Sequence, residues 1–130
     1  MEKEIITSEK LRKPHGIYSH AVKVKANNLL FIKGTTARDR DGNIVGKGDV
    51  KAQTRQIFEN IKIILETAGA TFDNIVKMTL FVTDINQFKE IHEVRAEYFK
   101  QDYPASTMVQ VSRLASESLL IEIEAIAALD

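Results

Sequence analysis

Two glutamates, Glu122 and Glu124, are the side chains whose type and spacing most directly suggest chemistry in this sequence. They stand two residues apart in the run IEIEAIA, and residues i and i+2 of a strand project to the same side of a sheet. One carboxylate could hold a water molecule or act as a general base, with a pKa raised by apolar neighbours. The alternative is a solvated or salt-bridged strand face, with Lys77 as the partner, and the spacing alone favours this alternative.

A second group of candidates lies in FIKGTTARDRDGN, where an apolar run ends at a glycine. Gly34 would let a ligand approach the backbone closely, and threonine hydroxyls such as that of Thr35, with free N–H groups, could hold an oxyanion. Arg38 could then clamp a carboxylate. The segment lacks phosphate-loop spacing, so nucleotide binding has little support. The end of a strand running into a turn accounts for the same residues without a ligand.

The histidines and one tyrosine give weaker signals. His15, His20 and His92 form no pair at metal-ligand spacing, and the chain contains no cysteine, so we expect neither a metal site nor a thiol nucleophile. His92 is typical of a partly exposed histidine on a helix. Tyr18 is typical of a packing residue with a hydrated hydroxyl.

Apolar periodicity predicts the elements that must position these side chains. Asp49 can cap a helix that runs to about Ala68, and Asp84 with Gln87 resembles a capping box for a second helix that Pro104 ends. Turns at residues 27–28 and 115–118 would join neighbouring strands as hairpins. Strands are predicted at 17–25, 29–34, 75–82, 107–114 and 119–127. The order β-β-α-β-α-β-β describes an α+β sandwich with both helices on one face of the sheet.

The two faces of this predicted sheet differ in polarity. The first face suits packing under the helices and carries Val76, Met78, Leu80, Val82, Leu119, Ile121, Ile123 and Ala125. The second face mixes polar and apolar residues, namely Ile75, Lys77, Thr79, Phe81, Leu120, Glu122, Glu124 and Ile126. A mixed face of this kind is often covered by another subunit. Exposed antiparallel faces also carry scattered apolar residues, and this is the alternative.

Bulk composition excludes several classes of protein. The chain has 130 residues, with 18 Lys plus Arg against 18 Asp plus Glu, which fits one domain over residues 1–130 with no net charge. No basic excess indicates a nucleic-acid partner or a membrane surface. The start MEKEIITSEKLRK has no apolar targeting segment, and no run approaches the ~20 apolar residues of a membrane span. We therefore expect a cytoplasmic protein.

Several blocks together resemble the Rid family, also called the YjgF or UK type. GIYSHAV is similar to its Gly-Pro-Tyr-Ser-Gln-Ala start, and LLFIKGTT resembles its strand ending in Ser-Gly-Gln. The segment from QTRQIFENI to VTDINQF is similar to its long helix and following strand. YPASTMVQVSRL and IEIEAIA match its C-terminal pair. The resemblance spans nearly the whole chain and implies a fold of the YjgF/chorismate mutase-like type that assembles as a homotrimeric barrel.

The same resemblance implies an activity and a site. The archetype hydrolyses reactive enamines and imines derived from amino acids, without a cofactor, in clefts between subunits. Its motif arginine binds the substrate carboxylate, and a glutamate helps to place the attacking water. Tyr18, Gly34 and Glu122 match family site positions in this sequence. Lys33 stands in place of a serine, His92 in place of a frequent asparagine, and Met108 in place of a frequent cysteine.

Ser106 occupies the position of the motif arginine, and this is the main departure from the family. A serine has one donor and no charge, so it cannot replace a charge-assisted carboxylate contact. The run GTTARDRDGN resembles the Gly-Thr-x-x-Arg of aminomuconate deaminase-like members, so Arg38 and Lys33 are the replacement cations and His92 is a candidate acid or base. Two hypotheses follow: a cofactor-free deaminase-like hydrolase acting on a small carboxylate, or a non-catalytic trimer that binds metabolites or protein clients. Ribonuclease activity gains no support from the neutral charge.

Overall fold

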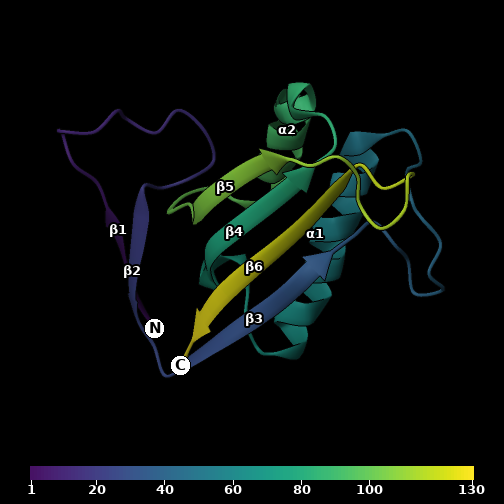
Figure 1. Ribbon diagram of the computed structural model, residues 1–130. Helices are drawn as coiled ribbons and strands as arrows, with labels where there is room; N and C mark the ends of the chain where they lie inside the picture. Colours follow the sequence, from purple (N-terminus) through teal and green to yellow (C-terminus); the bar gives the residue numbers. More distant parts are fainter.

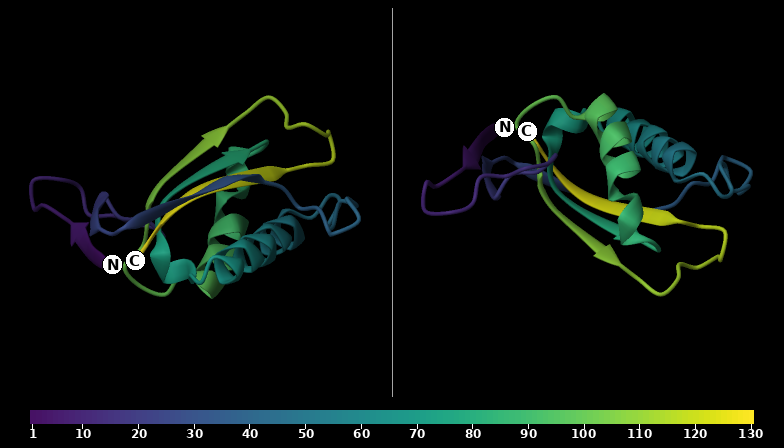
Figure 2. Two further views of the ribbon diagram at one scale, coloured as in Figure 1. Left: turned by 90° about the horizontal axis from the view of Figure 1, so that it is seen from below. Right: turned by 90° about the horizontal axis from the view of Figure 1, so that it is seen from above.

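The computed structural model describes residues 1–130 as a mixed sheet with two helices on one of its faces (Figures 1 and 2). The main sheet has the strand order β3-β6-β4-β5, in which only the β4–β5 pair is parallel. Strands β1 and β2 form a separate antiparallel ribbon. The elements are β1 (Glu2–Ile6), β2 (Ala21–Lys25), β3 (Asn28–Thr35), α1 (Val50–Thr67), β4 (Ile75–Val82), α2 (Phe88–Tyr98), β5 (Ala105–Gln110) and β6 (Ile121–Leu129). Two short 3-10 helices, η1 (Phe72–Asn74) and η2 (Ile85–Gln87), precede β4 and α2. The predicted α+β architecture is confirmed.

The predicted N-terminal hairpin is wrong. Strand β2 pairs with β1, which was not predicted, and opposite charges face each other across that pair at Glu2–Lys25 and Glu4–Lys23. Such cross-strand pairs favour this register. Strand β2 also begins only at Ala21, because the preceding residues run along the edge of β5, where Ser19 N–H donates to the Pro104 carbonyl at 3.0 Å. The turn at residues 27–28 therefore joins two different sheets.

The predicted C-terminal hairpin is also wrong, because β6 pairs with β3 and β4 and not with β5. Buried residues alternate along β6 and end in the buried pair Ala127 and Ala128, whereas β5 has no fully buried residue. The more buried strand takes the inner position, where both of its edges are hydrogen-bonded, and β5 takes the edge. Strand β5 starts at Ala105 and ends at Gln110, earlier than predicted at both ends.

The helices form largely where expected, with one different start. Asp49 caps α1 by accepting from the Ala52 N–H, and the chain turns away at Gly69, whose φ is +77°. The predicted capping box at residues 84–87 is absent. Asp84 instead caps η2 by accepting from the Asn86 N–H, and α2 begins at Phe88 without a side-chain cap. Neither helix is long and apolar enough to cross a membrane.

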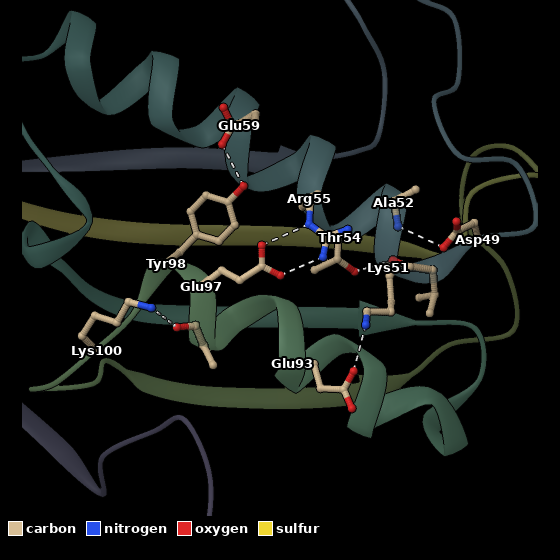
Figure 3. A network of polar contacts seen from close by, with 12 residues as sticks. Asp49, Lys51, Ala52, Thr54, Arg55, Glu59, Glu93, Glu97, Tyr98 and Lys100 are labelled. Carbon is tan, nitrogen blue, oxygen red and sulfur yellow. Dashed lines mark hydrogen bonds and ion pairs between the residues drawn. The ribbon is translucent and has the colours of Figure 1, made fainter.

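A row of polar contacts joins α1 to α2 on their outer side (Figure 3). Lys51 pairs with Glu93 at 2.9 Å and Arg55 with Glu97 at 2.8 Å. The Tyr98 hydroxyl donates to Glu59 at 2.7 Å. Solvent-exposed pairs of this kind contribute little to stability. These contacts show how α2 is rotated about its axis. Glu93 and Glu97 face α1, and His92 and Arg95 therefore face β5.

The two sheet faces differ as predicted. Met78, Leu80 and Val82 of β4 are buried under the helices with Ile121, Ile123 and Ala125 of β6. One residue differs: a bulge between Ile75 and Lys77 buries Ile75 in place of Val76. No element of this chain covers the second face (Figure 2). Phe31 on that face is 71% exposed and Leu29 56% exposed.

Candidate functional site

The candidate residues form two groups on opposite faces of the sheet. The first group lies between α2 and the edge strand β5. Alternation along β5 directs Ser106 and Met108 toward α2, while His92 and Arg95 come from one side of that helix. Tyr18 arrives on the N-terminal segment that follows the edge of β5. Together with His15, Ile85 and Phe88 these side chains line a pocket of about 310 Å³, which we call the α2–β5 pocket.

Arg95 is the charged group at the centre of this pocket. Its side chain is 2% exposed. Nη2 donates to the Ile17 carbonyl at 2.6 Å and to Ser106 Oγ at 3.1 Å. Nε is buried without a hydrogen-bond partner. Burial lowers the pKa of Arg95 to about 10, so the guanidinium remains a cation at neutral pH.

His92 lies beside Arg95 and is half-buried. Burial, the neighbouring Arg95 cation and His15 together lower the pKa of His92, so the neutral imidazole is favoured at pH 7. Nδ1 is buried without a partner. Nε2 faces the backbone of Gly16, where an added Cβ would lie 2.9 Å away. Nδ1 of the ring thus has no hydrogen-bond partner, and the ring lies next to a cation. A histidine in these surroundings can accept a proton and transfer it.

Tyr18 and His15 form the outer wall of the pocket. The Tyr18 hydroxyl lies 3.3 Å from His15 Nδ1, and the two rings meet edge to face at 6.0 Å between centroids. Tyr18 is held in place because Ser19 is buried and hydrogen-bonded to the end of the Tyr103–Pro104 segment. The hydroxyl is thus presented to the pocket by a fixed backbone.

The second group, Glu122 and Gly34, lies on the uncovered face. Strand β3 has a bulge between Ile32 and Thr35, and Gly34 in that bulge lies against the carboxylate of Glu122. A side chain at position 34 would collide with that carboxylate. Glu122 itself makes no hydrogen bond or ion pair within this chain. Lys77 does not pair with it, since Lys77 donates to Thr107 Oγ1 at 3.0 Å.

The remaining candidates stand apart from both groups. Arg38 donates to the Gly42 carbonyl of its own loop at 2.8 Å and lines a separate depression beside α1. Thr35 is buried, and its hydroxyl donates to the Lys33 carbonyl at 3.0 Å. Lys33 is exposed and donates to the Gly34 carbonyl at 3.2 Å. One chain thus brings Tyr18, His92, Ser106 and Met108 together, but leaves Lys33, Gly34, Thr35, Arg38 and Glu122 elsewhere.

Arg95 is the residue that the sequence analysis missed. It belongs to the buried residues of α2, with Ile91 and Val94. A charged residue on the apolar stripe of a helix is unusual, because arginine is rarely fully buried unless paired. That position on the stripe was the available signal. No group of three or more His, Cys, Asp or Glu side chains is placed to hold a metal ion.

This arrangement defines a small α+β protein with two helices on one sheet face, an uncovered second face and polar groups on both sides. Residues 8–129 match the protein family described as Endoribonuclease L-PSP. A RutC family protein of Pyrococcus horikoshii is 49% identical over 125 residues, which cover 96% of this chain and 97% of the relative. A RutC family protein of Pyrococcus abyssi is 46% identical over 127 residues, 98% of each chain.

A solved structure agrees with this match. The crystal structure of YyfB from Yersinia pestis, a Rid-family protein described as of unknown function, has a TM-score of 0.92 at 34% identity and covers 99% of this chain and 100% of that one. The chain therefore belongs to the Rid/YjgF family, the family matched under the name Endoribonuclease L-PSP. The resemblance expected from the sequence blocks is confirmed.

Proposed function

We propose that this protein is a cofactor-free hydrolase of the enamine/imine deaminase type that acts on a small carboxylate-bearing metabolite. The observation that carries the proposal is the unpaired carboxylate of Glu122, held against Gly34 on a sheet face that no other part of the chain covers. A carboxylate in this position can orient and deprotonate a water molecule. Water adds across the C=N bond, with oxygen on carbon and hydrogen on nitrogen. The adduct then releases ammonia and leaves the carbonyl compound.

The site is completed between chains of a homotrimer. The α2–β5 pocket and Glu122 lie on opposite faces of one sheet, so a single chain does not bring them together. Phe31, Leu29 and Val109 are large apolar residues exposed on the uncovered face or its edge. Exposed apolar surface of this kind favours association with a second copy. A neighbouring copy that covers this face would bring its own pocket toward Glu122.

Each candidate residue then has a role in the shared cleft. Glu122 positions the water, and His92 in its neutral form accepts or returns a proton during ammonia release. Tyr18, Ser106 and Met108 line the pocket around the substrate, and Gly34 and Thr35 shape the backbone beside the carboxylate. Lys33 and Arg38 are the cations that the sequence offers for the substrate anion.

A non-catalytic trimer that binds metabolites or protein clients is the second candidate function. The observation that favours it is Ser106, which supplies no charge at the position where the resemblance expects an arginine. The endoribonuclease of the family description has less support, because the chain carries 18 basic against 18 acidic residues and so no basic excess for a phosphate backbone.

Ammonia release separates the two candidate functions. Freshly generated iminopyruvate and 2-aminomuconate are offered to the purified protein, and at least one is expected to release ammonia faster than in buffer. Glu122→Gln should lower that rate by about a hundredfold, which is typical for loss of a general base. Glu124→Gln is the matched control, since Glu124 lies two residues along on the same strand face. If neither substrate is turned over and Glu122→Gln has no effect on any enamine, the hydrolase proposal fails.

A further inference from the structure

Arg95 is a buried charge for which this chain supplies no counter-charge. The ion pairs of the structure do not include it, and burial is what lowers its pKa, with no acidic group opposing. Both of its hydrogen bonds leave from Nη2, while Nε is buried without a partner. A guanidinium carries five N–H donors, so most of them are uncommitted. Burying such a cation unpaired costs free energy that a bound anion would offset.

The walls of the α2–β5 pocket suit an organic anion. No aspartate or glutamate lines it. Its volume of about 310 Å³ lies at the lower end of the range for small-molecule sites. Ile85 and Phe88 remain 39% and 49% exposed, so apolar surface is left uncovered beside the cation. The apolar wall consists of Ile85, Phe88 and Met108, and the polar wall of His15, Tyr18, His92, Arg95 and Ser106.

We propose that Arg95 binds the carboxylate of the substrate, and that Ile85, Phe88 and Met108 contact a short apolar or conjugated body. This inference rests on the proposed function and assigns the anion to Arg95 in place of Lys33 and Arg38. Nη2 already donates to Ser106 Oγ, so the serine hydroxyl is free to donate its own hydrogen to the same carboxylate. A planar guanidinium and a hydroxyl thus share one anion.

Lys33 and Arg38 are less suited to this task within the chain that carries the pocket. Arg38 donates to the Gly42 carbonyl at 2.8 Å, and Lys33 lines the same depression beside α1 as Arg38, apart from the α2–β5 pocket. A purely structural role for Arg95 would need only Nη2, which ties the Ile17 carbonyl to β5. That role leaves Nε and Nη1 unexplained. It also predicts that Arg95 variants change stability without discriminating between charged and neutral ligands.

The test compares a stable conjugated carboxylate with its neutral counterpart. Sorbate and sorbamide are titrated into the wild-type protein, Arg95→Gln and the control Arg113→Gln, which removes an exposed arginine. Arg95→Gln should weaken sorbate binding by roughly ten- to a hundredfold and leave sorbamide binding unchanged. Arg113→Gln should match the wild type. Adding Ser106→Arg to Arg95→Gln should restore sorbate binding, because position 106 faces the same pocket.

A second measurement needs no variant and covers a failure of Arg95→Gln to fold. In the wild-type protein, the Nε–Hε NMR signal of Arg95 should shift on saturation with sorbate and stay in place with sorbamide. The inference is overturned if that signal does not respond to sorbate, if Arg95→Gln weakens both ligands equally, or if the wild type binds neither. Sorbate binding without ammonia release would uphold the role of Arg95 and contradict the proposed hydrolase. Ammonia release by Arg95→Gln with an unchanged KM would support the proposed hydrolase and contradict the role of Arg95.

Discussion

His92 and Arg95 show how much a single residue depends on its neighbours. The sequence predicted His92 as a candidate acid or base from the family resemblance, and the structure places it half-buried beside a cation. The periodicity of α2 indicates that Arg95 faces inward, which is an unusual place for an arginine, but it does not show which residues Arg95 meets there. Its contact with Ser106 is a tertiary contact between α2 and β5.

The lowered pKa of His92 predicts how stability changes with pH. The folded protein disfavours the charged imidazole, so the unfolded chain takes up a proton first as the pH falls below about 6.5, the ordinary histidine value. The contribution of neutral His92 to the free energy of unfolding is therefore fully present above that pH and decreases as the pH falls below it. Denaturant unfolding at pH 7.5 and 5.5 should show a larger loss for the wild type than for His92→Gln. An equal loss in both proteins would contradict this assignment.

At the scale of elements, the sequence predicted the helices and the strand faces better than the strand partners. The helix stripe and the Asp49 cap are local signals, so α1 was predicted within a residue or two. Alternation fixes which side chains share a face, but it does not say which strand lies alongside. Both predicted hairpins failed for this reason. The position of β6 depends on its burial between β3 and β4, which is a property of the whole sheet.

The bulge in β3 predicts the effect of a small substitution. Gly34 is close to the Glu122 carboxylate, so Gly34→Ala should displace that side chain. The obstacle is the end of a flexible side chain and not backbone, so the fold should survive with a change in unfolding free energy of no more than about 1 kcal/mol. Ammonia release should fall at least about tenfold, because the displaced carboxylate no longer positions the water. Full activity in Gly34→Ala would argue against a role for Glu122.

At the scale of the whole molecule, the uncovered sheet face is the main feature. The sequence predicted a mixed face from the alternation of β4 and β6, and the structure confirms that it is mixed and open. What covers it is not encoded in the pattern of one chain. Phe31, 71% exposed, is the most exposed large apolar side chain on it.

A charge at Phe31 should prevent assembly. Burial of a phenylalanine contributes about 2 kcal/mol per chain, and a lysine in its place would carry an unpaired charge into the interface. Light scattering should give a trimer for the wild type and a monomer for Phe31→Lys. Ile63→Lys is the matched control, because Ile63 is 63% exposed but lies on α1, away from this face. A wild-type monomer, or a trimer that tolerates Phe31→Lys, would contradict the proposed interface.

Complementation between two defective variants tests the shared site most directly. Glu122→Gln and Arg95→Gln chains are dissociated, mixed in equal amounts and reassembled, and ammonia release is measured at a substrate concentration below KM. If each site takes Glu122 from one chain and Arg95 from the next, about a quarter of the sites in random trimers regain both native residues. The mixture should then recover about a quarter of the wild-type rate, well above either variant alone. A mixture no more active than its two components would contradict the account.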